Sequence, residues 1–125
     1  AGHYPLLDHA RAAVAVFHQT QDRPKMIAWA MTGYELVSDQ FQPCGDHAGK
    51  WETSLLMHLD PGMQDLSTLP TDRSVAPIGA SNNGIQDANA EFGRQAVEAI
   101  VAEVKKRIDE FLAHPERYQG HGAPM

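Results

Sequence analysis

Hydrophobic positions recur at helical spacing in two stretches of the chain. From Pro5 to about Gln19 the apolar residues fall on one face with a 3.6-residue period, and this stripe consists of Leu6, Ala10, Ala13, Val14 and Phe17. Asp87 or Asn89 can cap a second helix, whose stripe consists of Phe92, Ala96, Val97, Ile100, Val101, Val104, Ile108 and Phe111. The pattern predicts one helix over 5–19 and a long helix over about 88–113, followed by a solvated tail over 114–125.

The run from Lys25 to Met31 has a different pattern. Its hydrophobic residues are nearly continuous, which is typical of a strand buried on both faces in a parallel sheet. A second, shorter strand is predicted near 75–78, inside an irregular stretch over 63–86 that is rich in Pro, Gly and Asn. Strands between helices indicate an α/β fold. Because two strands are too few for a parallel sheet, we expect this chain to supply only part of such a domain.

A short helix is predicted between the two strands. Thr53 or Ser54 can cap it, and the segment Asp60-Pro61-Gly62 stops it after about Leu59. The loop before it, over 40–50, is polar and contains Gly, Pro and Asp.

Composition narrows the class of protein. The 125 residues carry a formal net charge of -6, which argues against a nucleic-acid binder because phosphate backbones attract clustered Lys and Arg. The single cysteine, Cys44, cannot form an internal disulfide and favours a reducing, cytoplasmic compartment. No run of about 18 apolar residues predicts a membrane span.

The segment Asp46 to Ser54 carries the densest candidate chemistry. An imidazole (His47) and two carboxylates (Asp46 and Glu52) stand within seven residues, where a Gly-containing loop enters a helix. Imidazole exchanges protons near neutral pH, and a glutamate can bind a divalent metal. Trp51 is a candidate wall for a substrate pocket. The structural alternative is a loop whose Glu52 only caps the helix.

Three weaker candidates lie elsewhere. His3 follows Gly2 at the start of the chain, where it either projects toward a ligand from a strand end or is a terminal histidine without function. His114 and His121 belong to the predicted solvated tail. Cys44 stands three residues before His47, which makes a thiol–imidazole pair conceivable, although no other feature resembles a thiol enzyme.

One segment resembles a known family. The sequence His47-Ala48-Gly49-Lys50-Trp51-Glu52-Thr53-Ser54 resembles the His-Ala-Gly-x-x-Glu-Thr-Ser signature of the creatininase (creatinine amidohydrolase) family. Gly2-His3 is similar to the end of that family's Asn-Gly-His motif. The run Gly84 to Arg94 with the helix after it resembles the family's C-terminal segment. Residues 1–125 therefore resemble the C-terminal half of a creatininase-like domain.

The resemblance implies a fold, an activity and roles for particular residues. It implies a Rossmann-like three-layer α/β/α domain and a metal-dependent hydrolase that cleaves the C–N bond of a small, often cyclic, amide. Two divalent ions (Zn, Mn or Fe) are implied at each site. His3 and Glu52 would bind metal, Glu52 would also orient water, and His47 would carry the proton. Asp46, Trp51 and Tyr4 would line the pocket.

The same resemblance implies a partner. The family's remaining metal ligands, a Glu-x-His pair and an Asp, belong to its N-terminal half, and no segment here matches them. Since the chain also begins without Met, we expect a companion chain or an N-terminal half to supply them, within a homo- or hetero-oligomer. Creatininase has Glu at the position of Pro5, so the substrate stays open. The alternatives are a non-catalytic fragment or assembly subunit, and the same metal site acting on a cyclic ketone or a sugar-like ring.

Overall fold

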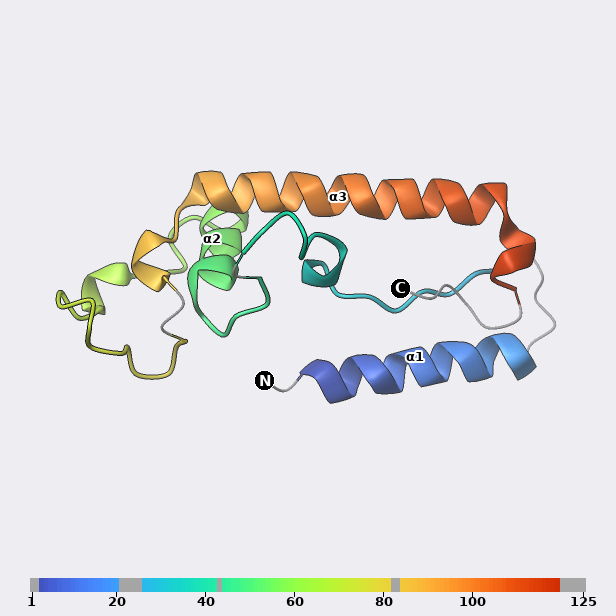
Figure 1. Cartoon of the computed structure of the whole chain (residues 1–125), viewed down its shortest axis with the longest axis horizontal. Helices are drawn as coiled ribbons and strands as arrows, with labels where there is room; N and C mark the ends of the chain where they lie inside the picture. The colour runs from blue at the N-terminus through green and yellow to red at the C-terminus, as the bar shows by residue number, and fades with distance from the viewer. Residues whose placement is uncertain (1–2, 21–25, 43, 82–83, 120–125) are drawn as a thin grey trace. The chain divides into compact units, whose positions relative to one another are not determined.

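The computed structural model describes residues 3–20, 26–42, 44–81 and 84–119, without the side chains of His3 and Tyr4. Its α-helices are α1 (His3–Thr20), α2 (Lys50–Leu59) and α3 (Ala90–Ala113) (Figure 1). Short 3₁₀ turns join or follow them, and these are η1 (Tyr34–Leu36), η2 (Leu66–Thr68), η3 (Ile85–Asp87) and η4 (Pro115–Arg117). No helix in the described ranges has both the length and the apolar character needed to cross a lipid bilayer.

The prediction of an α/β, Rossmann-like three-layer domain is wrong. The described residues form helices and contain no strand. In the expected first strand, residues 26–31 have no regular secondary structure, and in the expected second strand Ile78 is fully exposed. An apolar run becomes a strand only where another strand accepts its peptide hydrogen bonds. The described part of this chain offers no such neighbour.

Both long helices were predicted from their periodicity. Helix α1 covers the predicted span 5–19, and α3 covers most of the predicted span 88–113. Asn89 is the capping residue of α3, since its Oδ1 accepts a hydrogen bond of 2.8 Å from the N–H of Phe92. Helix α2 begins at Lys50, so the prediction that Thr53 or Ser54 caps it is wrong.

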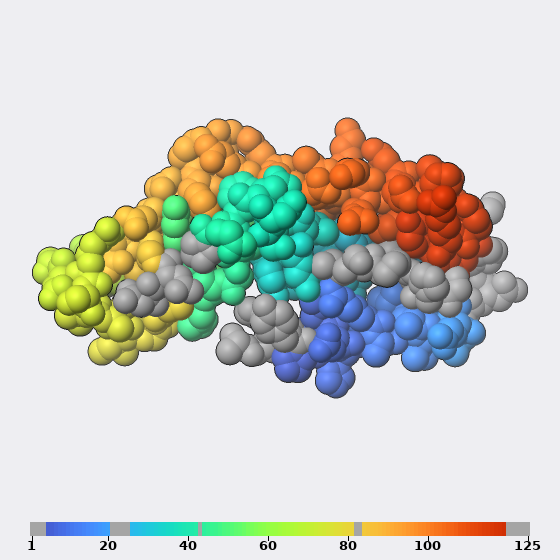
Figure 2. Space-filling model, viewed as in Figure 1, coloured from blue at the N-terminus to red at the C-terminus, as the bar shows by residue number. Residues whose placement is uncertain are grey.

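The chain divides into two compact units. The first contains residues 1–33 and 102–125, and the second contains residues 34–101, so α3 contributes to both. In the second unit the segment between α2 and η3 lies on the surface (Figure 2, yellow-green) and contains several exposed apolar side chains, among them Met63, Val75 and Ile78.

His18 joins three segments of the first unit. Its Nδ1 lies 3.0 Å from the backbone oxygen of Gln119, and its Nε2 accepts a 2.9 Å hydrogen bond from the N–H of Ala28. Because a carbonyl oxygen only accepts, Nδ1 must donate, and the ring is the neutral tautomer with its proton on Nδ1. Nearby, the rings of Trp29 and Phe111 meet edge to face at 5.3 Å. The residues from 114 to 119 are therefore partly folded against the first unit, rather than forming the solvated tail expected from the sequence, whereas 120–125 lie outside the described residues.

The second unit has a small aromatic core. Val37, Trp51 and Ala96 are almost fully buried, and around them pack Tyr34, Leu36, Phe41, Cys44, Leu55, Phe92, Ala99 and Ile100. The predicted stripe of α3 is buried only in part, because Val101 is 61% and Ile108 is 45% exposed while Ala96 is completely covered. The chain thus leaves part of its predicted apolar surface in solvent.

Candidate functional site

The Asp46 carboxylate holds the start of α2. Its Oδ2 accepts a hydrogen bond of 2.8 Å from the N–H of Trp51, and its Oδ1 accepts one of 3.1 Å from the N–H of Glu52. The first N–H groups of a helix have no partner inside the helix, and a carboxylate there also gains from the helix dipole. Asp46 is 7% exposed. The structure therefore gives this predicted pocket residue a capping role.

Glu52 closes the same turn from the other side. Its Oε2 accepts a hydrogen bond of 2.8 Å from the N–H of Ala48, while the hydroxyl of Thr53 donates to the Ala48 oxygen at 3.3 Å. Ala48 has a φ of 48°, in the left-handed region that non-glycine residues seldom adopt. Two side-chain bonds thus hold the residue after His47 in a strained conformation. One oxygen of Glu52, Oε1, accepts no hydrogen bond from the described residues.

Position 49 has no room for a side chain, so it must be glycine. A Cβ at this position would lie 2.3 Å from Oδ2 of Asp46 and 2.7 Å from Oγ of Ser81. Any other residue would push the carboxylate away from the helix N–H groups that it caps. The glycine of the signature is therefore explained by the close approach of two side chains.

Ser54 joins α2 to the start of α3. Its fully buried hydroxyl oxygen accepts a 3.0 Å hydrogen bond from the N–H of Asn89. A Cβ at Gly93 would lie 1.9 Å from the Ser54 backbone oxygen, so the two helices touch through backbone atoms. The Thr and Ser of the signature therefore act in the turn and in the helix contact, respectively.

Trp51 belongs to the core. It is 2% exposed, and its ring meets those of Phe41 at 5.6 Å and Phe92 at 6.2 Å, both edge to face. The Lys50 ammonium lies 4.3 Å from the centre of the Phe92 ring, a cation–π distance. In this chain the indole is part of the core that packs beneath the turn.

His47 differs from its neighbours. Its backbone oxygen accepts a hydrogen bond of 2.6 Å from the N–H of Ser81, which fixes the main chain. Its side chain is exposed, and the described residues give its ring no hydrogen bond, ion pair or aromatic contact. The structure thus presents a free imidazole on a rigid turn.

Cys44 is unsuited to be a nucleophile. Burial, and to a smaller extent the charge of Asp46, raise the pKa of its thiol from 9.0 to about 11. Its Sγ lies 3.3 Å from the Tyr34 backbone oxygen. A thiolate paired with His47 is therefore not supported.

The N-terminal candidates belong to the other compact unit. His3 lies in the first turn of α1, in the unit that does not contain Glu52. Its side chain, that of Tyr4, and the whole of Gly2 and His121 lie outside the described residues. His114 lies at the end of α3, with Nδ1 3.6 Å from Oε1 of Glu116.

Two residues that support the turn were not expected to do so from the sequence. Gly93 carried a usable signal, because glycine inside a helix is unfavourable and often marks a close backbone contact. Ser81 carried none, since nothing in the sequence pairs it with His47.

Among the described residues, no three His, Cys, Asp or Glu side chains come together as a metal site. The chain matches no known family model, no curated protein and no solved structure.

Proposed function

We propose that this chain contributes His47, as a proton-transfer group, and Glu52, as a metal ligand, to a metal-dependent hydrolase of the creatininase type. A companion chain completes the site. One observation supports this most: from Asp46 to Ser54, every other polar side chain has a contact within the fold, whereas the His47 ring has none with the residues that the structure describes. A rigid turn with one free imidazole is the kind of preorganised group that proton transfer needs.

The role of His47 follows from the chemistry of amide cleavage. Water adds its oxygen to the carbonyl carbon, the C–N bond breaks, and the nitrogen leaves with a proton that came from the water. An amide nitrogen leaves poorly until it is protonated. An imidazole can accept the proton from the attacking water and then donate it to the nitrogen. Such a group contributes roughly a hundredfold to ten-thousandfold in rate.

The metal that the resemblance implies is only partly accounted for by this chain. Both oxygens of Asp46 and Oε2 of Glu52 accept hydrogen bonds from peptide N–H groups. Within the described part of the chain, Oε1 of Glu52 is the carboxylate oxygen of the turn that accepts none. The described residues do not fit a complete metal centre. We therefore assign proton transfer to His47 and one ligand of a Zn, Mn or Fe site to Glu52, and the remaining metal ligands to the companion chain.

A second function, that of a non-catalytic assembly subunit, is favoured by the exposed apolar residues Val101, Ile108 and Leu112 of α3. A cyclic ketone or sugar-like ring as substrate keeps the site and changes the reaction. The first proposal also includes a cytoplasmic oligomer. The single cysteine favours a reducing compartment, and the missing metal ligands favour a further chain in the assembly.

The test is turnover by the natively assembled protein on a panel of cyclic amides that includes creatinine, with a cyclic ketone and a sugar-like ring beside them. His47→Ala is expected to lower kcat by about 100-fold or more while bound metal, measured by elemental analysis, stays constant. The control is His9→Ala, which removes an exposed histidine of α1 whose Nδ1 lies near the Pro5 oxygen. Unchanged turnover in His47→Ala would remove His47 from the mechanism. No turnover and no bound metal in the wild type would favour the assembly subunit.

A further inference from the structure

His18 connects α1 to two other segments of the first unit through both of its ring nitrogens. The residue is 7% exposed, its Nε2 accepts a hydrogen bond from the N–H of Ala28, and its Nδ1 donates one to the Gln119 oxygen. Its other contact with the described residues is the ring of Phe17, which it meets edge to face at 5.5 Å. One side chain thus links three stretches of the chain that are separate in sequence.

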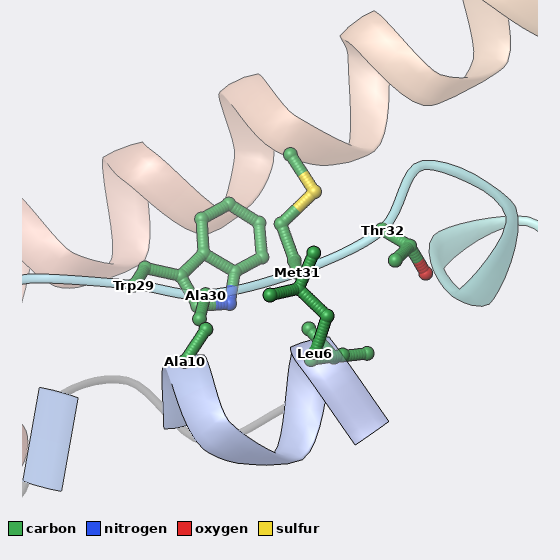
Figure 3. Close-up of a pocket in the computed structure, with 7 residues that line it drawn as sticks. Leu6, Ala10, Trp29, Ala30, Met31 and Thr32 are labelled. Atoms are coloured by element: carbon green, nitrogen blue, oxygen red, sulfur yellow. The ribbon is translucent and has the colours of Figure 1, made fainter. Parts of the chain in front are cut away.

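The apolar packing between α1 and the segment after it is incomplete. A cavity of about 390 Å³ lies against both, and it is lined by Leu6, Leu7, Ala10, Trp29, Ala30, Met31 and Thr32 (Figure 3). Side chains that face a void lack the dispersion contacts of a packed core. The two hydrogen bonds of His18 therefore carry a larger share of the attachment of α1 than they would in a filled interface.

Only the neutral His18 ring can make both bonds. An imidazole that donates at one nitrogen and accepts at the other carries a single ring proton. A second proton would place an N–H on Nε2, opposite the N–H of Ala28, and two donors cannot bond to each other. It would also leave a charge buried away from water. The closed arrangement therefore excludes the proton, whereas an imidazole in water takes one up at about pH 6.5.

The described surroundings of His18 offer no opposite charge to a protonated ring. The segment 26–31 contains no charged residue. In the segment 114–119 the titratable side chains interact with one another or with α3, and these are His114 with Glu116, and Arg117 and Tyr118 with Glu110. On α1, Arg11 stands seven positions earlier on the same face and is itself a cation. Protonation would therefore break the bonds of His18 without forming an ion pair among the described residues.

We propose that His18 is an acid-sensitive latch, which holds α1 on the first unit and releases it when the ring is protonated. Both bonds that break join α1 to other segments, whereas Trp29 stays on α3 through its edge-to-face contact with Phe111. Falling pH favours the open form, because that form alone binds the extra proton. Between pH 7.5 and pH 5.5 the ratio of open to closed chain is expected to rise about tenfold.

The test is amide hydrogen exchange on the purified protein at pH 7.5 and pH 5.5, with each rate divided by its intrinsic value at that pH to give a protection factor. The protection factor of the Ala28 amide is expected to fall about tenfold at the lower pH. The amide of Phe41 donates to the Val37 oxygen at 3.1 Å in the second unit, and its protection is expected to stay constant. Nitrogen-15 spectra at pH 7.5 are expected to show the His18 proton on Nδ1.

Two variants separate His18 from other titrating groups. His18→Gln removes the imidazole, so the pH dependence of Ala28 protection is expected to disappear. His9→Gln is the matched control, because His9 is exposed on the same helix, and the tenfold change is expected to persist in it.

Three results would overturn the latch. One is an Ala28 protection factor that is equal at the two pH values in the wild type. Another is a His18 ring that carries its proton on Nε2 at pH 7.5. The third is a full tenfold change in His18→Gln, which would assign the pH dependence to another group. If His18→Gln did not fold, the wild-type comparison of Ala28 with Phe41 would decide by itself.

Discussion

Gly93→Ala tests the contact between α2 and α3 that positions the signature turn. The added Cβ would lie 1.9 Å from the Ser54 oxygen and 2.5 Å from its carbonyl carbon, whereas real Cβ atoms essentially never approach closer than 3.0 Å. Both neighbours are backbone atoms and cannot rotate away. The helices would have to separate by about 1 Å, which also strains the hydrogen bond from Asn89 to the Ser54 hydroxyl.

Two opposing effects set the size of the change. Replacing glycine by alanine inside a helix stabilises it by about 1 kcal/mol. Overpacking costs about 1–3 kcal/mol, often more when only backbone can yield, and a weakened hydrogen bond costs about 1 kcal/mol. Because steric and hydrogen-bond losses exceed the helix gain, we expect the free energy of unfolding to fall by roughly 1–3 kcal/mol.

The assay is urea unfolding followed by far-UV circular dichroism, with Ala102→Gly as the control. Ala102 is exposed in α3, so this control reports helix propensity alone and is expected to destabilise by about 1 kcal/mol. If Gly93→Ala instead stabilised the chain by about 1 kcal/mol, propensity alone would govern the position. The backbone contact between α2 and α3 would then be absent.

Two further predictions concern the turn itself. Asp46→Ala removes both caps of α2 and is expected to lower the free energy of unfolding by about 2 kcal/mol in the same urea assay; an effect no larger than that of Asp39→Ala, an exposed residue, would refute the capping role. Cys44 has its pKa raised from 9.0 to about 11, so at pH 8 its thiolate fraction, and hence its alkylation by iodoacetamide, is expected to be about a hundredfold lower in the folded chain than in urea. The folded rate should climb about tenfold per pH unit up to pH 10, and equal folded and unfolded rates at pH 8 would contradict the burial of the thiol.

Local signals predicted the helices well and the sheet badly. The stripes of α1 and α3 and the Asn89 cap are properties of short windows, so the sequence alone contains them. Strand pairing depends on residues far away or on another chain. The run from Lys25 to Met31 has the composition of a buried strand, but in the described chain it has no strand beside it. The strand prediction failed because composition indicates that a segment is buried, but it does not show which segment packs beside it.

The candidate site was predicted in part for a similar reason. The spacing from Asp46 to Glu52 marks a loop that enters a helix, and the structure confirms that loop. Which carboxylate caps the helix is decided by the positive φ of Ala48 and by the narrow space at Gly49, and neither is visible in spacing. The contact of Ser81 with His47 comes from a distant segment of irregular structure, where the sequence has no periodic signal.

The central claim is that the site of this chain is shared with a companion chain, and denaturing intact-mass analysis of the natively assembled protein tests it most directly. The account predicts a second mass in equal amount, on a chain that carries the missing Glu-x-His and Asp ligands. A single mass, that of this chain alone, would contradict the shared site and would leave His47 without a metal-dependent hydrolase to serve.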